Sequence, residues 1–321
     1  MKKNTIIINR RGFLKGATFS TAGLMLGNLS AFSNGKSEQV PRVNGEFDPA
    51  YEVMKEVMKY RKIDAYGNAY APNSREAKSQ IEDADKLGIK FFFIASPIAV
   101  KMGKTPDEIR TYNNNVLQAV KQHPDRLTGQ FTIHPAYPKE SLEEMKRCID
   151  QGMVGMKLYN QVKINDPLFY PVLEKYIDYN MIIHVHGETQ LGVGGYRMQY
   201  DVKNTPTISV PEDFVDVAKR YPEAMFQYAH IGGGSDWEYA CKTFRNYKNI
   251  YVDTGGSNNE EGMIDFAVET LGEDRVFFGC DSSYFQGIGK ILAADVNDNQ
   301  KKKLFFDNYN NVLRKSGRSL A

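Results

Sequence analysis

The sequence predicts an α/β fold, a closed (β/α)8 barrel in which eight parallel strands are each followed by a helix. Short apolar runs alternate with amphipathic, helix-length segments eight times between about residues 61 and 315. Runs of this kind are typical of parallel strands buried on both faces, and eight such units close into a barrel. Four of the five histidines fall at predicted strand ends, where the active site of such a barrel is built. An open doubly wound sheet is the alternative, but a span of about 250 residues favours closure.

The elements follow one another in strict alternation. Continuous apolar runs place strands at 62–66, 89–95, 127–134, 153–158, 181–186, 225–230, 250–254 and 276–280. Amphipathic periodicity places helices at 75–87, 106–122, 140–151, 168–179, 211–220, 236–247, 260–271 and 299–315. The longest segment without periodicity, 189–209, follows a strand, so we expect it to lie over the barrel mouth.

The N-terminal residues 1–33 do not fit this pattern. Arg10 and Arg11, followed by Gly-Phe-Leu-Lys, resemble a twin-arginine export signal, and a moderately apolar run then ends in small residues near Ser33. The run is too short and weakly apolar for a stable membrane span. We expect an exported protein, periplasmic or otherwise extracytoplasmic, with a retained basic helix as the alternative. Residues 34–45 are a polar linker and 46–321 form the barrel domain.

Replacement of both arginines, Arg10→Lys with Arg11→Lys, is expected to block export, because the arginine pair is the feature that the export route recognises. Mass spectrometry of the exported wild-type protein should find an N-terminus near Asn34. Recovery of a form with intact Met1 outside the cytoplasm would count against a cleaved signal.

The charge balance bears on the kind of partner. Lys and Arg number 41 against 39 Asp and Glu, a net charge of +2, which gives no electrostatic reason to expect nucleic acid or an acidic membrane surface. The dense basic run 301–303 is expected to be a solvated helix face. We expect a small-molecule substrate, and the sequence leaves a homo-oligomer open.

Several short motifs occur in a particular order. Residues 155–159 read Gly-Met-Lys-Leu-Tyr, 228–233 read Tyr-Ala-His-Ile-Gly-Gly, and 278–281 read Phe-Gly-Cys-Asp. In this order and spacing, over about residues 60–315, they resemble the fourth-, sixth- and eighth-strand motifs of the amidohydrolase-related (amidohydrolase 2) family. That resemblance implies a TIM barrel of the metal-dependent hydrolase superfamily.

The first strand departs from the family pattern. The family reads Ile-Asp-x-His-x-His there, and this chain has Tyr66 and Asn68 at the two histidine positions. The resemblance implies a divalent metal, usually zinc, whose surviving ligand positions are His184, His230 and Asp281. Phenol and amide oxygens are far weaker zinc ligands than imidazole. We therefore expect any metal to be single and weakly held, or absent, and Tyr66 and Asn68 to contact substrate instead.

Three further side chains are candidates for the site. His186 shares a strand face with His184, so it is expected to bind substrate or to supply a substitute imidazole. Lys157 would bind a substrate carboxylate or, with a pKa depressed by burial, act in base or Schiff-base chemistry. A lysine whose stem packs while its head reaches solvent is the alternative. Arg197, in the long loop, would pair with a carboxylate through two hydrogen bonds or be an ordinary surface arginine.

These residues support three functions. The leading prediction is an exported hydrolase for a small anionic or cyclic lactone, amide or ester, with Asp281 activating water. The second is a metal-independent lyase or decarboxylase, in which His230 and Asp281 transfer protons and Lys157 or Arg197 holds a carboxylate. The third is a non-catalytic binding barrel with a decayed metal site. The fold alone does not choose between them.

Overall fold

A computed structural model of the chain describes residues 42–43, 46–47, 52–95, 104–188, 207–231, 236–256, 258 and 260–320. The residues of the predicted export signal lie outside this description. Arg42–Val43 (β1), in the predicted linker, pairs antiparallel with Glu46–Phe47 (β2), which follows directly after it. The described barrel residues all belong to one compact unit, residues 40–321.

Eight parallel strands form the barrel, in two hydrogen-bonded groups. One group has the order β3-β4-β5, with β3 at Lys62–Asn68, β4 at Ile89–Ala95 and β5 at Leu127–Gly129. The other has the order β10-β9-β8-β7-β6. Its strands are β6 (Met156–Leu158), β7 (Ile182–Val185), β8 (Met225–Tyr228), β9 (Ile250–Asp253) and β10 (Val276–Phe277).

Backbone hydrogen bonds join the two groups at both seams. Beyond β5, the carbonyl of Phe131 accepts from the Lys157 N–H at 2.7 Å, and Phe131 forms a parallel bridge with Met156. On the other side, the Ala65 N–H donates to the Phe278 carbonyl at 2.9 Å. The ring of strands is therefore closed, and the predicted TIM barrel is confirmed.

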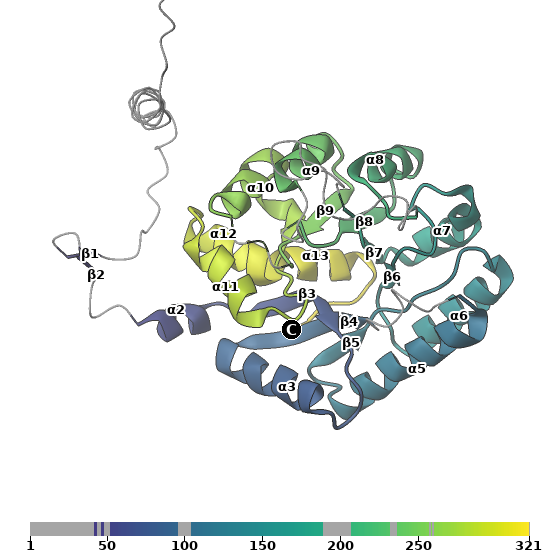
Figure 1. Ribbon diagram of the computed structural model, residues 1–321, viewed down its shortest axis with the longest axis horizontal. Coiled ribbons are helices and arrows are strands. Elements are labelled where there is room, and N and C mark those ends of the chain that lie inside the picture. The colour runs from purple at the N-terminus through teal and green to yellow at the C-terminus, as the bar shows by residue number, and fades with distance from the viewer. Residues whose placement is uncertain are drawn as a thin grey trace, which may run out of the picture. The chain divides into compact units, whose positions relative to one another are not determined.

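Helices surround the strands, as Figure 1 shows. They are α2 (Val53–Lys59), α3 (Arg75–Leu87), α5 (Pro106–Gln122), α6 (Pro138–Asp150), α7 (Tyr170–Tyr176), α8 (Pro211–Arg220), α9 (Trp237–Phe244), α10 (Met263–Leu271) and α11 (Tyr284–Ala293). The single helix predicted at 299–315 consists instead of α12 (Asp298–Lys302), a π-helical turn (Lys303–Asp307) and α13 (Asn308–Lys315). The sequence prediction also missed α11.

Local sequence explains where the longer helices begin and end. Ser74 caps α3 by accepting from the Ala77 N–H, and Gly88 ends that helix with a left-handed φ of 67°. Thr105 and Glu108 form a reciprocal capping box at the start of α5. These caps satisfy backbone N–H groups that a helix leaves unpaired at its first turn.

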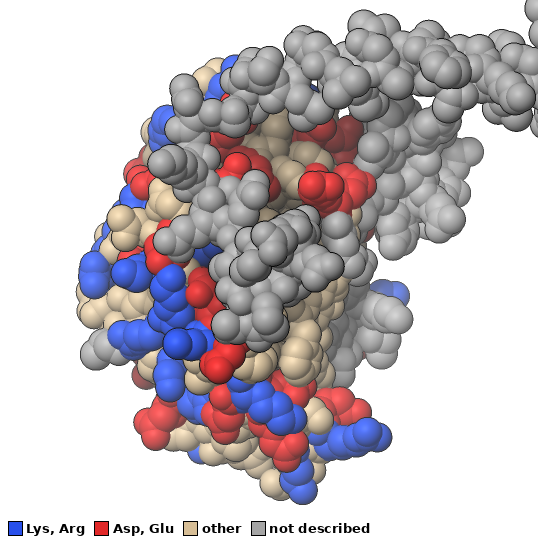
Figure 2. All heavy atoms as spheres, turned by 90° about the vertical axis from the view of Figure 1, so that its left-hand side faces the viewer, with Lys and Arg blue, Asp and Glu red and all other residues tan. Residues whose placement is uncertain are grey.

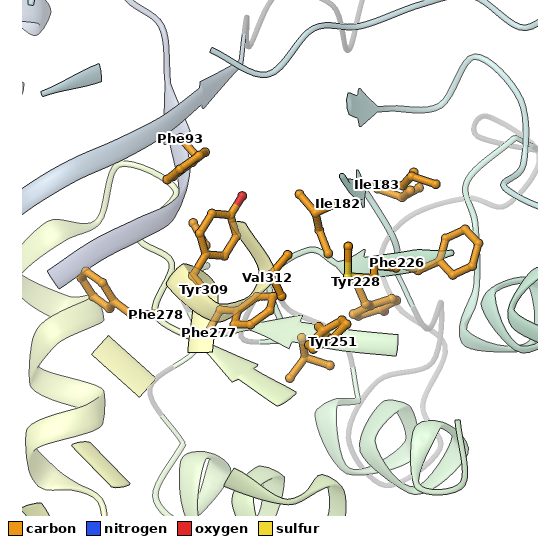
Figure 3. Close-up of a cluster of buried hydrophobic side chains, with 14 of the residues drawn as sticks. Phe93, Ile182, Ile183, Phe226, Tyr228, Tyr251, Phe277, Phe278, Tyr309 and Val312 are labelled. Carbon is orange, nitrogen blue, oxygen red and sulfur yellow. The ribbon is translucent and has the colours of Figure 1, made fainter. Parts of the chain in front are cut away.

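The C-terminal helix closes the N-terminal end of the barrel. Tyr309 and Val312 of α13 pack among the inward-facing side chains of the strands (Figure 3). The Tyr309 ring lies 4.5 Å from that of Phe93 and 5.1 Å from that of Phe277, between ring centroids. Because this end is filled by aromatic side chains, the functional site belongs at the opposite, C-terminal end of the strands.

On the face shown in Figure 2, lysine and arginine side chains are interspersed with aspartate and glutamate side chains. Among the described residues, no helix has the length and apolar content needed to cross a membrane.

Candidate active site

A lysine and a histidine on neighbouring strands form the centre of the candidate site. Lys157 of β6 pairs in register with His184 of β7, and the Lys157 Nζ lies 2.9 Å from the His184 Nε2. Both side chains are completely buried. Burial lowers the pKa of Lys157 to about 7. The carboxylates of Asp253 and Asp281 have the opposite, smaller effect and raise this pKa. Burial and the nearby lysine lower the pKa of His184 to about 3.

The proton on His184 is fixed by the group behind it. The Gln130 Nε2 donates to the Tyr309 hydroxyl at 3.1 Å, so the Gln130 Oε1 faces the His184 Nδ1, also at 3.1 Å. The Nδ1 must then carry the proton, which leaves the Nε2 as an acceptor. Because His184 is neutral, the Lys157 amino group is the donor in the contact between them.

A second chain of contacts runs from His230 to a buried carboxylate. The His230 Nε2 lies 2.9 Å from the His186 Nδ1, and the His186 Nε2 lies 3.3 Å from the Glu188 Oε1. Since a carboxylate only accepts, His186 donates to Glu188 and its Nδ1 accepts from His230. The His230 Nδ1 is buried and has no hydrogen-bond partner in the described structure. Burial also holds the pKa of His230 well below its usual range.

Asp253, at the end of β9, holds the backbone around His230. Its Oδ1 accepts from the N–H groups of His230 (2.9 Å) and Gly255 (3.0 Å), and its Oδ2 accepts from the Gln227 Nε2 (2.8 Å). The Oδ2 also lies 3.4 Å from the His184 Nε2. Burial alone would raise the pKa of Asp253, but its polar contacts, among them the hydrogen bond from Gln227, outweigh burial and lower it to about 2.

The backbone is strained where the strands reach the mouth. His230, Asp281 and Ser282 have positive φ angles of 44°, 45° and 69°. Residues other than glycine rarely adopt this region, and such strain concentrates at functional sites. The Asp281 N–H donates to the Tyr66 carbonyl at 2.9 Å, which fixes this turn against β3.

The two first-strand positions of the predicted metal site have other partners. The Asn68 Nδ2 donates to the Asp281 Oδ1 at 3.1 Å and to the Ser282 Oγ at 2.9 Å. The Tyr66 ring lies edge-on to the His184 ring at 4.6 Å and stacks on the His230 ring at 5.8 Å, between centroids. The Lys157 Nζ lies 4.0 Å from the centroid of the Tyr66 ring.

These residues do not fit a metal ion in the arrangement observed. Asn68 turns its N–H₂ group, which cannot be a ligand, toward Asp281, and the His184 Nε2 accepts from Lys157. Across the described part of the chain, no set of three or more His, Cys, Asp or Glu side chains is placed to hold a metal.

Most of the residues predicted from sequence thus lie together at one end of the barrel. Lys157, His184, His186, His230, Tyr66, Asn68 and Asp281 form connected contacts, whereas Arg197 lies outside the described residues. The sequence prediction missed Asp253, Gln130, Gln227 and Glu188. Two of these had a usable signal, because Asp253 ends a predicted strand and Glu188 lies two residues beyond His186.

A closed barrel with histidines, a lysine and carboxylates at the C-terminal ends of its strands defines the class as a TIM-barrel protein with its site at the C-terminal face. A model of the amidohydrolase family matches residues 98–308, and the chain belongs to that family.

Several of the similar proteins are decarboxylases. The chain is 23% identical over 271 residues to 2-amino-3-carboxymuconate-6-semialdehyde decarboxylase of Dictyostelium discoideum, covering 76% of this chain and 74% of that protein. It resembles the structure of 5-carboxyvanillate decarboxylase from Sphingomonas paucimobilis, with a TM-score of 0.63, 14% identity and coverage of 80% of this chain and 99% of the other. Dihydroxybenzoic acid decarboxylase from Polaromonas sp., solved with manganese and the inhibitor 2-nitroresorcinol, matches with a TM-score of 0.62, 15% identity and coverage of 81% and 98%.

These relatives correct the leading prediction of function. The prediction of a hydrolase for lactones, amides or esters, with Asp281 activating water, is wrong. These relatives are decarboxylases, which cleave a carbon–carbon bond and release CO₂. The physical reason for the error is that histidine, lysine and carboxylate side chains at a barrel mouth serve either chemistry.

Proposed function

We propose that this protein is a decarboxylase of a small aromatic or unsaturated carboxylic acid. The observation that carries the proposal is the buried His230 Nδ1, which has no partner and lies at the end of the chain from Glu188 through His186. Decarboxylation replaces CO₂ with a proton on carbon, so it needs a group that delivers a proton inside a site shielded from water. The names of the relatives support the substrate class.

The contact chain can deliver that proton. In the resting arrangement His230 donates to His186, and the His230 Nδ1 carries a lone pair. A proton taken up at the His230 Nδ1 from solvent or from a substrate hydroxyl makes this ring an imidazolium, whose charge is stabilised by the hydrogen bond to His186 and, beyond it, by the Glu188 carboxylate. Transfer from the His230 Nδ1 to the substrate carbon, followed by cleavage of the bond to the carboxylate, returns the bonding electron pair to the carbon skeleton and releases CO₂.

We also propose that any metal in this site is single and weakly held, or absent. The relatives with manganese show that the fold accommodates a metal, but here Asn68 and the His184 Nε2 are engaged by protein groups. The chemistry proposed above needs no metal step. We further propose that the protein is exported to the periplasm and that its partner is a small-molecule substrate.

The purified full chain is expected to release CO₂ from at least one member of a panel of hydroxybenzoic, carboxyvanillic and unsaturated dicarboxylic acids. In D₂O the product should carry one deuterium on the carbon that lost the carboxylate, because the proton comes from an exchangeable histidine. CO₂ and product are measured by mass spectrometry. Hydrolysis of an ester or lactone without CO₂ release would reject the proposal.

A further inference from the structure

We propose that the Lys157 amino group takes the place of a metal ion in this site and, in its protonated form, binds the substrate carboxylate. The replacement of a metal ion by Lys157 is argued from geometry alone. The binding of a substrate carboxylate by Lys157 rests on the proposed function.

The position of Lys157 is the first support. Its Nζ lies 2.9 Å from the His184 Nε2, which is the atom of a neutral imidazole that would bind a metal. It also lies over the Tyr66 ring, and Tyr66 stands at a position where the family has a metal-binding histidine. One ammonium therefore contacts two of the positions that the family uses for ligands.

The charges around Lys157 are the second support. The Asp253 Oδ2 lies 3.4 Å from the His184 Nε2, the same atom that the Lys157 Nζ contacts, and the Tyr66 and Tyr159 rings present their faces at 4.0 and 5.2 Å from the Nζ. Carboxylates and aromatic faces attract any cation. A metal ion beside the ammonium would be repelled, so lysine and metal exclude each other.

The unused donors of Lys157 are the third support. An ammonium has three N–H donors, and in the described structure the Nζ has one hydrogen-bond partner, the His184 Nε2. Burying a charged group without partners is costly, so a completely buried ammonium with open donors is suited to receive an anion. A carboxylate would use both remaining donors. Because Lys157 is fully buried, binding also requires a neighbouring side chain to move aside.

The metal-replacement part is tested by equilibrium dialysis of folded full-length variants against Mn²⁺, with bound metal measured by mass spectrometry. Wild type should hold no stoichiometric manganese. Tyr66→His with Asn68→His should bind weakly, and adding Lys157→Met should tighten binding by about 10-fold or more, because the competing charge is gone. Lys62→Met in the same double variant is the control, since Lys62 is equally buried but donates to the backbone carbonyls of Val57 and Tyr60.

Two results would overturn the proposal that Lys157 replaces a metal ion. One is stoichiometric manganese retained by wild type, and the other is an equal affinity of the histidine variant for Mn²⁺ with and without Lys157. If the histidine variants do not fold, isothermal titration of wild type, Lys157→Met and Lys62→Met with benzoate decides the carboxylate part. Lys157→Met should weaken benzoate binding by about 10-fold or more, and equal affinities would reject it. Neither measurement depends on turnover, so failure of the decarboxylase proposal is seen separately in the CO₂ assay.

Discussion

A His230→Asn variant is expected to lose decarboxylation activity by about 100-fold to 10,000-fold, the usual contribution of a positioned acid or base. Asparagine cannot carry the proton that His230 would deliver from its Nδ1. It is also the residue other than glycine that best tolerates a left-handed backbone, and His230 has a φ of 44°. The fold should therefore survive. Initial rates and melting temperature, measured on the same preparation, check both parts.

His134→Asn is the matched control for this variant. His134 also follows a strand of the barrel, but its Nδ1 accepts from the Ala136 N–H at 3.2 Å, a role that an amide oxygen can fill. The activity of His134→Asn should stay within about 2-fold of wild type, since the described contacts of the His134 ring are with Ala136 and Tyr137 and not with the residues of the site. If His230→Asn lowers the melting temperature and leaves turnover per folded molecule unchanged, His230 is structural and the decarboxylase mechanism fails.

The fold was predictable because its signal is local. Eight apolar runs separated by amphipathic segments specify strand and helix without knowledge of any long-range contact. The exception is the region after β10, where α11 was not predicted and a π-helical turn interrupts the helix predicted at 299–315. Irregular helices of this kind depend on tertiary packing, here of Phe305 and Tyr309 against the strands, which periodicity does not report.

The site was predictable as a set of residues but not as a set of contacts. Their positions at predicted strand ends placed His184, His230 and Asp281 at the same barrel mouth. The contact between Lys157 and His184 depends on the register of β6 against β7, which short apolar strands do not encode. Likewise, nothing in the sequence shows that Asn68 donates to Asp281. The type of reaction is harder still, because it depends on which atoms remain free once all such contacts are made.

Two completely buried aspartates on strands of the barrel, Asp64 and Asp253, should respond differently to replacement by asparagine. Burial raises the pKa of Asp64 to about 8, so its carboxyl is protonated in the folded protein at pH 7. Its Oδ1 accepts from the N–H groups of Tyr66 and Cys280, both at 2.9 Å, and an amide oxygen can do the same. Asp64→Asn should therefore change the free energy of unfolding by less than about 1 kcal/mol.

Asp253→Asn, in contrast, is expected to lower the free energy of unfolding at pH 7 by about 3 kcal/mol, because it removes an ionised partner from a buried network. The amide would turn its N–H₂ group toward Gln227, which is already a donor, and Lys157 would lose a nearby negative charge. The melting temperature should fall by about 5 to 10 °C, as expected for a domain of this size. Thermal and urea unfolding of the two variants measure the difference.

The pH dependence gives an independent check on Asp253. Its folded pKa of about 2 lies below the ordinary value of 3.8, so its ionised form stabilises the fold above pH 4 and this contribution disappears as the pH falls toward 2. The lost stability is about 2 kcal/mol, from the size of the shift. The gap in unfolding free energy between wild type and Asp253→Asn should therefore narrow by that amount between pH 4 and pH 2, if both proteins remain folded there. A gap that stays constant over this range would mean that Asp253 is not an ionised acceptor for Gln227, and that polar contacts of a neutral side chain hold the backbone of His230.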